Sequence, residues 1–410
     1  MSACMRSGAA ALGACALVLN VANTACAQNA SDLPAQDRPI LLDMRDLHAI
    51  GGMDAEPWAQ FGSVAQVAFD GRGLLYILDR VAQRVVVIDE NGRLVRTLGR
   101  EGRGPGEFIA PGSMAVFDDG SVIVYDLIRR TFSAFDSAGA LRFDVRVPLD
   151  HGAPDAIFPL PDGRLVANAI VFRVDGAPHF RTSRGMTPTS RGRVLVFSAD
   201  ARTPGTIADT YTPGQAPVVG GAPVRIAFQP AFSMAVSRDG RIVFADSTTY
   251  TLHLLHTAGP QTLIRRPLQP RRVTEEDRRN ERERQLALLD APDARAMGAS
   301  LGGSVDRRAA LEREREQLRQ MRFASEIPVI AGVAVDWAGR IWVQRTGRRV
   351  GEPGPIDVIA PAAEYIGTVT SGFGLPAAFG PDGRVAFIDT DELDVQRIRV
   401  ARVRSPALRD

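Results

Sequence analysis

Short apolar runs of four to eight residues, separated by turns that contain aspartate and glycine, recur along the whole chain. The stretch SVAQVAFDGRGLLYILD (63–79) shows the unit, in which an apolar run, a turn and a second apolar run follow one another. Six copies span 63–79, 113–126, 155–169, 232–246, 331–345 and 376–389. A second pair of runs follows five of them, most clearly at 84–99, 132–147 and 356–372. Runs of this length joined by glycine turns are typical of hairpins, so each unit predicts a four-stranded antiparallel sheet.

A single sheet of this size cannot bury both of its faces, but sheets stacked around an axis can, which favours a β-propeller. The last unit offers three clear strands, ending in 394–403, while an unpaired strand-like segment at 39–50 precedes the first unit. We expect this N-terminal strand to complete the last blade, because that pairing leaves no long open edge. The prediction is an all-β, six-bladed propeller over residues 39–403.

The junction after the first unit, GREGRGPGEFIAP (99–111), and the blade core LLYILDRVAQRVVVID (74–89) resemble six-bladed propellers of the NHL-repeat or TolB-like type. The glycine-rich junction lacks the lysine and the hydroxyl residue of a phosphate-binding loop. We therefore interpret it as a crossover between blades. Its structural residues are expected to be Gly102, Gly104, Pro105, Gly106 and Phe108, with glycines that permit positive φ, a proline that stiffens the path and a phenylalanine that packs between sheets.

If the strands of a blade are called a to d from the axis outward, the a–b and c–d turns lie on one face of the disc. The b–c turns and d–a connections lie on the other. All a–b turns are short, and we call their side the plain face. The long segments 172–192, 211–230 and 271–326 belong to the other side, the elaborated face. Binding residues usually lie on loops carried by a rigid scaffold, so we expect the elaborated face to bind the ligand.

The insert at 271–326 predicts a helical hairpin between the fourth and fifth blades. Thr274 and Asp277 form a capping-box-like start, and a glycine-rich break near Gly302 separates two helical stretches. A thin apolar stripe is formed by Leu286, Leu289, Leu311, Leu318 and Met321. The hairpin is interpreted as an arm packed on the rim, with a lid over the axial channel or a dimer contact as alternatives.

No catalytic residue is predicted. The candidate ligand-binding residues are Arg103 and Glu107 of the first junction, His179 of the third-blade loop and Tyr211 of the following connection. Ser300 in GASLG matches a nucleophile-elbow pattern, but its flanks are helical and polar, whereas that chemistry requires a turn from strand to helix.

An aspartate recurs six residues after the turn glycine in four blades, at Asp79, Asp126, Asp246 and Asp389. At this place in a b–c turn, an aspartate side chain commonly accepts hydrogen bonds from nearby backbone N–H groups. We interpret the four as turn caps. The alternative is a ring of carboxylates that holds a divalent cation; no other cofactor is predicted.

Residues 1–27 have one cation, an apolar run and small residues at 25 and 27, which indicates a signal peptide followed by a linker at 28–38. Lipid anchoring at Cys26 is the alternative. All three cysteines lie in this segment, and residues 404–410 form a C-terminal tail.

The formal net charge of +2 gives no reason to expect nucleic acid as a partner, and no membrane span is predicted. The chain contains no lysine, which excludes Schiff-base chemistry.

Two hypotheses follow. The first is a secreted or periplasmic binding or scaffold module, without enzymatic activity, that recognises a peptide, protein or glycan on the elaborated face. The second is a metal-dependent, lactonase-like lyase or hydrolase with its site at the mouth of the central channel. The second rests on the resemblance to propeller enzymes alone.

Overall fold

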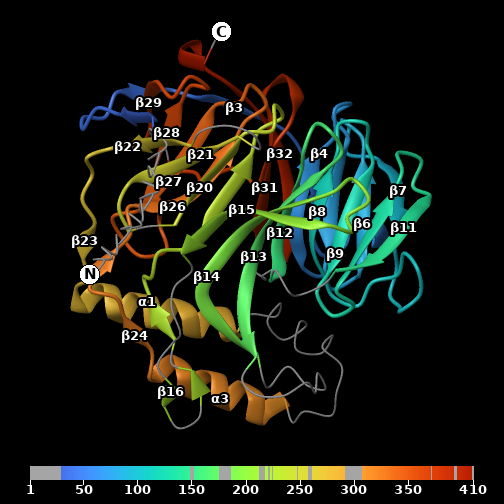
Figure 1. Ribbon diagram of the computed structural model, residues 1–410, viewed down its shortest axis with the longest axis horizontal. Helices are drawn as coiled ribbons and strands as arrows, with labels where there is room; N and C mark the ends of the chain where they lie inside the picture. The colour runs from blue at the N-terminus through green and yellow to red at the C-terminus, as the bar shows by residue number, and fades with distance from the viewer. Residues whose placement is uncertain are drawn as a thin grey trace, which may run out of the picture.

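The computed structural model describes residues 29–147, 152–174, 186–211, 218–219, 222–223, 225–246, 248–256, 261–290, 307–370, 372–391 and 395–408. Six sheets of four or five strands stand around a common axis (Figure 1). The chain is a six-bladed β-propeller, as the repeat predicts.

The first three blades consist of consecutive antiparallel strands. Blade 1 contains β4 (Val64–Phe69), β5 (Leu75–Asp79), β6 (Arg84–Ile88) and β7 (Leu94–Leu98). Blade 2 contains β8 (Pro111–Val116), β9 (Val122–Asp126), β10 (Thr131–Phe135) and β11 (Leu141–Arg146). Blade 3 contains β12 (Ala153–Pro159), β13 (Leu165–Val174), β14 (Met186–Phe197) and β15 (Pro204–Tyr211). The middle strands β5 and β9 are buried along their whole length, which explains their apolar runs LYIL and VIVY.

The other three blades each recruit a strand from the N-terminal segment. Blade 4 contains β19 (Ser233–Val236), β20 (Ile242–Ala245), β21 (Thr251–Leu255) and β22 (Thr262–Arg265), with β1 (Asn29–Asp32) added in parallel to β22. Blade 5 contains β26 (Ile330–Val335), β27 (Ile341–Thr346), β28 (Pro353–Ile359) and β29 (Tyr365–Val369), with β2 (Pro39–Ile40) added to β29. Blade 6 contains β30 (Ala378–Phe379), β31 (Arg384–Thr390), β32 (Gln396–Arg404) and β3 (Asp43–Gly51) as its outermost strand.

The predicted closure by an N-terminal strand is therefore confirmed, with β3 paired antiparallel to β32 from Asp43 to Gly51. The sequence did not indicate that the preceding residues would continue along the rim of blades 5 and 4. Residues 29–40, which we call the N-terminal strap, cover the outer edges of these two blades. Covered edges offer no unpaired N–H and C=O groups to another chain.

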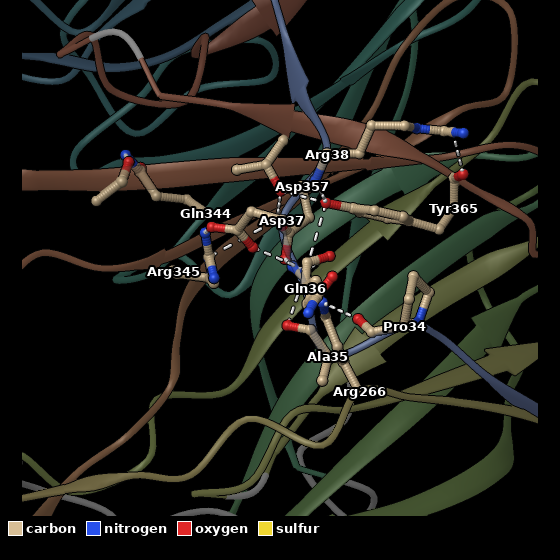
Figure 2. Close-up of polar contacts among 12 residues, drawn as sticks. Pro34, Ala35, Gln36, Asp37, Arg38, Arg266, Gln344, Arg345, Asp357 and Tyr365 are labelled. Atoms are coloured by element: carbon tan, nitrogen blue, oxygen red, sulfur yellow. Dashed lines mark hydrogen bonds and ion pairs between the residues drawn. The ribbon is translucent and has the colours of Figure 1, made fainter.

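A buried ion pair fastens the strap to blades 4 and 5 (Figure 2). Arg266 lies 2.7 Å from Asp357, and neither side chain has exposed area. The same guanidinium donates to the carbonyl oxygen of Pro34 at 2.8 Å and to the carboxylate of Asp37 at 2.8 Å. Arg345 holds the other oxygen of Asp37 at 2.7 Å. Burial alone would raise the pKa of Asp37, but the hydrogen bonds and charges of Arg345 and Arg266 lower it, so the strap carboxylate stays ionised.

Blades also contact each other through polar groups of their innermost strands. The Gln66 amide donates to the Met114 carbonyl oxygen at 2.8 Å, and Ser113 donates to the Gln66 side chain at 2.9 Å. The Ser113 hydroxyl in turn accepts a hydrogen bond from the backbone N–H of Ile157 at 3.0 Å. These bonds link blades 1, 2 and 3 in sequence around the axis.

The predicted helical hairpin is present between blades 4 and 5, and it lies with other small elements on one side of the disc (Figure 1). It contains α1 (Glu275–Asp290) and α3 (Arg307–Arg319), and the strands β23 (Arg271–Arg272) and β25 (Glu326–Ile327) pair at its base. The remaining short strands are β16 (Val218–Val219), β17 (Ala222–Pro223), β18 (Ile226–Ala227) and β24 (Arg322–Phe323). Three 3-10 helices are described, Pro57–Ala59, Pro381–Gly383 and Pro406–Leu408. Of the predicted stripe, Leu318 and Met321 are buried.

The Asp357→Asn substitution tests the role of the buried pair. Removal of this carboxylate leaves the buried Arg266 guanidinium with only Asp37 of the strap as an acidic partner, so the free energy of unfolding should fall by up to about 3–5 kcal/mol. Urea unfolding followed by circular dichroism measures the change. Glu352→Gln is the matched control because the Arg349–Glu352 pair is exposed, and its loss should cost less than about 1 kcal/mol. Equal losses in the two variants would contradict the assignment.

Candidate functional site

The innermost strands of four blades share a β-bulge near the elaborated face. In β4, β8, β12 and β26 one residue is left out of the pairing with the next strand, and each of these residues stands eight positions before the turn glycine of its blade. The residues are Ala65, Gly112, Asp155 and Ala331. Bulges occur frequently beside active sites, where they redirect a side chain. Three of these positions hold only glycine or alanine, so Asp155 is the one charged member of this set.

Asp155 is therefore a carboxylate beside the axis. Burial raises the pKa of Asp155, and the positive charge of Arg80 opposes that increase. Arg80 directly follows Asp79 in the b–c turn of blade 1, where its backbone N–H donates to the Ser63 carbonyl oxygen at 2.8 Å. The equivalent residue in blade 2, Leu127, packs over the bulge glycine of its own blade. The charge of Arg80 therefore reaches Asp155 from the neighbouring blade 1.

A cavity of about 640 Å³ lies between α1 and blade 5 on the elaborated face. Its wall includes Ala331, one of the bulge residues, so the cavity extends to the innermost strand of that blade. The polar side chains of the wall are Gln229, Arg271, Glu281, Arg284, Gln344, Arg345, Thr346, Arg349 and Glu352. Gly347, Gly351 and Gly354 add backbone groups. The cavity lies within the roughly 300–1,000 Å³ that is typical of ligand sites.

The basic side chains of this cavity are held in place by acidic partners. Arg271 forms two hydrogen bonds to Asp277, at 2.6 and 2.7 Å, and Arg284 forms two to Glu281, both at 2.8 Å. Arg345 is held by Asp37 of the N-terminal strap (Figure 2). Because a guanidinium has five N–H donors, an arginine with a bidentate acid partner keeps donors for a ligand.

The start of α1 is fixed by the predicted capping box. The Asp277 N–H donates to the Thr274 hydroxyl at 3.2 Å, and the Asp277 carboxylate accepts from the Thr274 N–H at 2.9 Å. The hydrogen bond from Arg271 lowers the pKa of Asp277 far below its ordinary value, and the bonds from Thr274 add to this effect. The helix that forms one wall of the cavity is thus anchored at its first turn.

Two of the four recurring aspartates act as turn caps, which agrees with our interpretation. Asp79 accepts from the backbone N–H groups of Gly62, Ser63 and Ala82. Asp126 accepts from four backbone N–H groups, those of Ile109, Ala110, Ile128 and Arg129. Both carboxylates are fully buried.

The other two recurring aspartates pair with side chains of their own blades. Asp246 lies 3.6 Å from His253, and Asp389 lies 2.6 Å from Arg399. Among the residues that the structure describes, no three His, Cys, Asp or Glu side chains gather in a group that could hold a metal ion.

The first junction keeps its polar residues within its own loop. Glu107 accepts from the Gly104 N–H at 2.8 Å and pairs with Arg100 at 2.9 Å; these contacts lower the pKa of Glu107. Gly102 has a φ of +153°, and a Cβ there would lie 2.0 Å from the Glu107 carboxylate. Phe108 is fully buried in the cluster between blades 1 and 2.

Of the other residues singled out in the sequence, those of the first junction are described by the structure, and two of the later loops are not. Arg103 is exposed, Pro105 is exposed, and Gly106 has a φ of +72°. His179 and Ser300 lie outside the described residues, as does the glycine break near Gly302. Tyr211 ends β15, where it pairs with Arg191. Of the candidates that the structure describes in full, Arg103 and Glu107 lie in the junction between blades 1 and 2 and do not line the cavity beside α1. The sequence offered a signal for Asp155, its fixed distance from the turn glycine, but none for the cavity.

A comparison with protein-family models agrees with the architecture. The family model DUF5128, described as a 6-bladed beta-propeller, matches residues 59–166. No curated protein matches the chain. Among solved structures, a DUF4221 family member from Bacteroides vulgatus is 10% identical, with 90% of this chain and 98% of that chain covered and a TM-score of 0.48. A gluconolactonase from Xanthomonas campestris is 11% identical, with coverages of 90% and 97% and a TM-score of 0.45. Virginiamycin B lyase from Staphylococcus aureus is 10% identical, with coverages of 88% and 99% and a TM-score of 0.40.

Within the described part of the chain, no helix has the length and apolar character needed to cross a membrane.

The Arg80→Met substitution tests the electrostatic coupling at the axis. Loss of the guanidinium removes a charge that favours the ionised carboxylate, so the pKa of Asp155 should rise further above its ordinary value. Carbon-13 NMR titration of the aspartate carboxyl groups measures this pKa, with Asp155→Asn to assign the resonance. Arg202→Met, at an exposed pair with Asp200, is the control and should leave the Asp155 titration unchanged.

Proposed function

We propose that this chain is an exported, non-enzymatic binding module of the NHL-repeat type, and that its ligand enters the cavity beside α1 on the elaborated face. The ligand is a hydroxyl- or amide-rich segment of a glycan or peptide. The observation that carries the proposal is the cavity itself, about 640 Å³ in volume, which extends from the helical insert to the bulge residue Ala331.

The chemistry of the wall supports a polar ligand without a large net charge. The arginines of the wall are matched by Glu281, Glu352 and the acids behind them, so donors and acceptors are both present. Gly347, Gly351 and Gly354 add backbone groups to this wall. Hydroxyl and amide groups need both donors and acceptors, as this wall offers.

The rigidity of the wall supports binding in the same way. Side chains whose rotamers are fixed by partners lose less entropy when a ligand orders them. Arg271, Arg284 and Arg345 each have a carboxylate partner within 2.8 Å. The site would be largely pre-formed before the ligand arrives.

Deletion of the insert tests this function. Because Arg272 pairs directly with Glu326 in the β23–β25 ladder, residues 273–325 can be replaced by an Asn-Gly turn without a change in the blades. We expect the shortened protein to keep its β-sheet circular dichroism spectrum and to lose ligand capture on glycan and peptide arrays. Capture equal to that of the intact protein would refute the placement of the site.

Arg284→Gln is the milder variant for the same arrays, since it keeps the helix and removes one charge of the wall. Capture should weaken about tenfold, because a hydrogen bond to a charged group contributes roughly 1.5–3 kcal/mol.

Metal analysis of the purified protein addresses the enzymatic alternative. One tightly held divalent ion per chain on the axis would favour the metal-dependent enzyme over the non-enzymatic module.

A further inference from the structure

The plain face is closed at most blade junctions by one recurring contact. Each a–b turn contains a glycine with a φ between +71° and +86°. In four blades, a side chain of the preceding blade lies over this glycine. Arg384 covers Gly73, Arg72 covers Gly120, Pro161 covers Gly240 and Arg241 covers Gly339, so that a Cβ on these glycines would lie 2.2, 2.1, 3.4 and 3.1 Å from the covering side chain.

The junctions between blades 2 and 3 and between blades 5 and 6 lack this cover. A Cβ at Gly163 would meet only Ala199 of its own blade, at 3.8 Å, and the nearest atom at Gly383 is the Val403 carbonyl oxygen of its own blade. The blade 5–6 junction is partly filled by the C-terminal segment, where Leu408 lines the space and accepts a hydrogen bond from Arg340.

The blade 2–3 junction has no such substitute among the described residues. The positions of blade 2 that correspond to the covering residues hold Asp118, Asp119 and Ser121, whose side chains are too short to reach across. The result is a groove of about 670 Å³ on the plain face.

The two walls of this groove differ in character. The blade 2 wall presents Asp118, Asp119 and Asp136, and the blade 3 wall presents Pro159, Leu160, Pro161 and Ala199, none of them charged. The aromatic rings of Phe117 and Phe143 contribute apolar surface between them. A ligand with both a cationic group and an apolar group matches this division.

The acidic wall is only partly neutralised. Arg238 of blade 4 pairs with Asp118 and lies over the Trp337 ring at 4.0 Å, which closes the inner end of the groove. Within the described ranges, no arginine lies within ion-pair distance of Asp119 or Asp136. A hydrogen bond from Ser121 lowers the pKa of Asp119, so this carboxylate is ionised at neutral pH. Arg142, at the outer end, is the other cation of the lining.

We propose that this groove is a second binding site, which takes a peptide segment of a partner protein that carries an arginine next to an aromatic or aliphatic residue. The guanidinium occupies the place over Gly163 that an arginine of the preceding blade fills at other junctions. It pairs there with Asp119, which stands at the position that Arg72 holds in blade 1 and lines the groove beside Gly163. The neighbouring apolar residue packs on Pro159 and Phe143. The site is separate from the cavity beside α1.

The probe for this site is acetyl-Phe-Arg-amide, and acetyl-Phe-citrulline-amide is its uncharged analogue. Isothermal titration calorimetry with the intact protein should show binding of the arginine probe at least tenfold tighter than binding of the citrulline probe. Equal affinities for the two probes, or no binding of the arginine probe, would overturn the proposal.

Asp119→Arg is the decisive variant. It places an arginine where blade 1 has Arg72, removes the carboxylate and covers Gly163, so affinity for the probe should fall at least tenfold. Asp382→Arg makes the same change of charge at the equivalent position of blade 6, at a junction that Arg384 already covers, and should bind like the unmodified protein.

A further variant, Ser121→Arg, introduces the covering residue at the position that Arg384 and Arg241 occupy in their blades, and should also weaken binding. Unchanged affinity in both Asp119→Arg and Ser121→Arg would refute the site. The protein with residues 273–325 deleted should bind the probe normally, which distinguishes this site from the proposed function of the elaborated face.

Discussion

The ring depends on the buried ion pair between Arg266 and Asp357. Arg266 follows the last strand of blade 4 and Asp357 lies in the third strand of blade 5, so the pair joins two blades. Two charges without solvent contact are stable only when their other hydrogen-bonding groups are also satisfied. The backbone of the N-terminal strap supplies these partners through Pro34 and Gln36, and its Asp37 supplies a second acid. The strap therefore completes the hydrogen bonding of Arg266, and it leads directly into β3, the strand that closes the ring.

The same network connects fold and site. Arg345 is held by Asp37 on one side and lines the cavity beside α1 on the other. The position of a side chain in the candidate site thus depends on the strap, which comes from the opposite end of the chain. On the axis, Asp155 is placed differently, by a bulge that three other blades share. The repeated bulge fixes the position of the backbone, and the aspartate that stands there in blade 3 supplies the charge.

The number of blades, the closure by an N-terminal strand and the place of the helical insert could be predicted from the sequence, because each depends on a local pattern. The strands β1 and β2 were missed because their four and two residues carry no alternation of their own. The pairing of Arg266 with Asp357 could not be predicted, since ion pairs between distant residues leave no periodic signal. Asp155 had such a signal, but the equivalent residues in the other blades are too small to mark the position as special. The cavity beside α1 depends on how the insert packs, which no local pattern indicates.

Short loops did not make the plain face featureless. The a–b turns share a geometry that leaves a space over the turn glycine, and a side chain of the preceding blade fills this space in four blades. A groove forms where that side chain is absent. Arginine suits this place, since its planar guanidinium can lie against a turn while it pairs with the aspartate of that turn, as Arg72 does with Asp70. The chain has no lysine, so every cation that performs this role is a guanidinium. Blade 2 carries acids at the corresponding positions, and the vacant place then has the charge and the shape that a guanidinium from outside the chain would match.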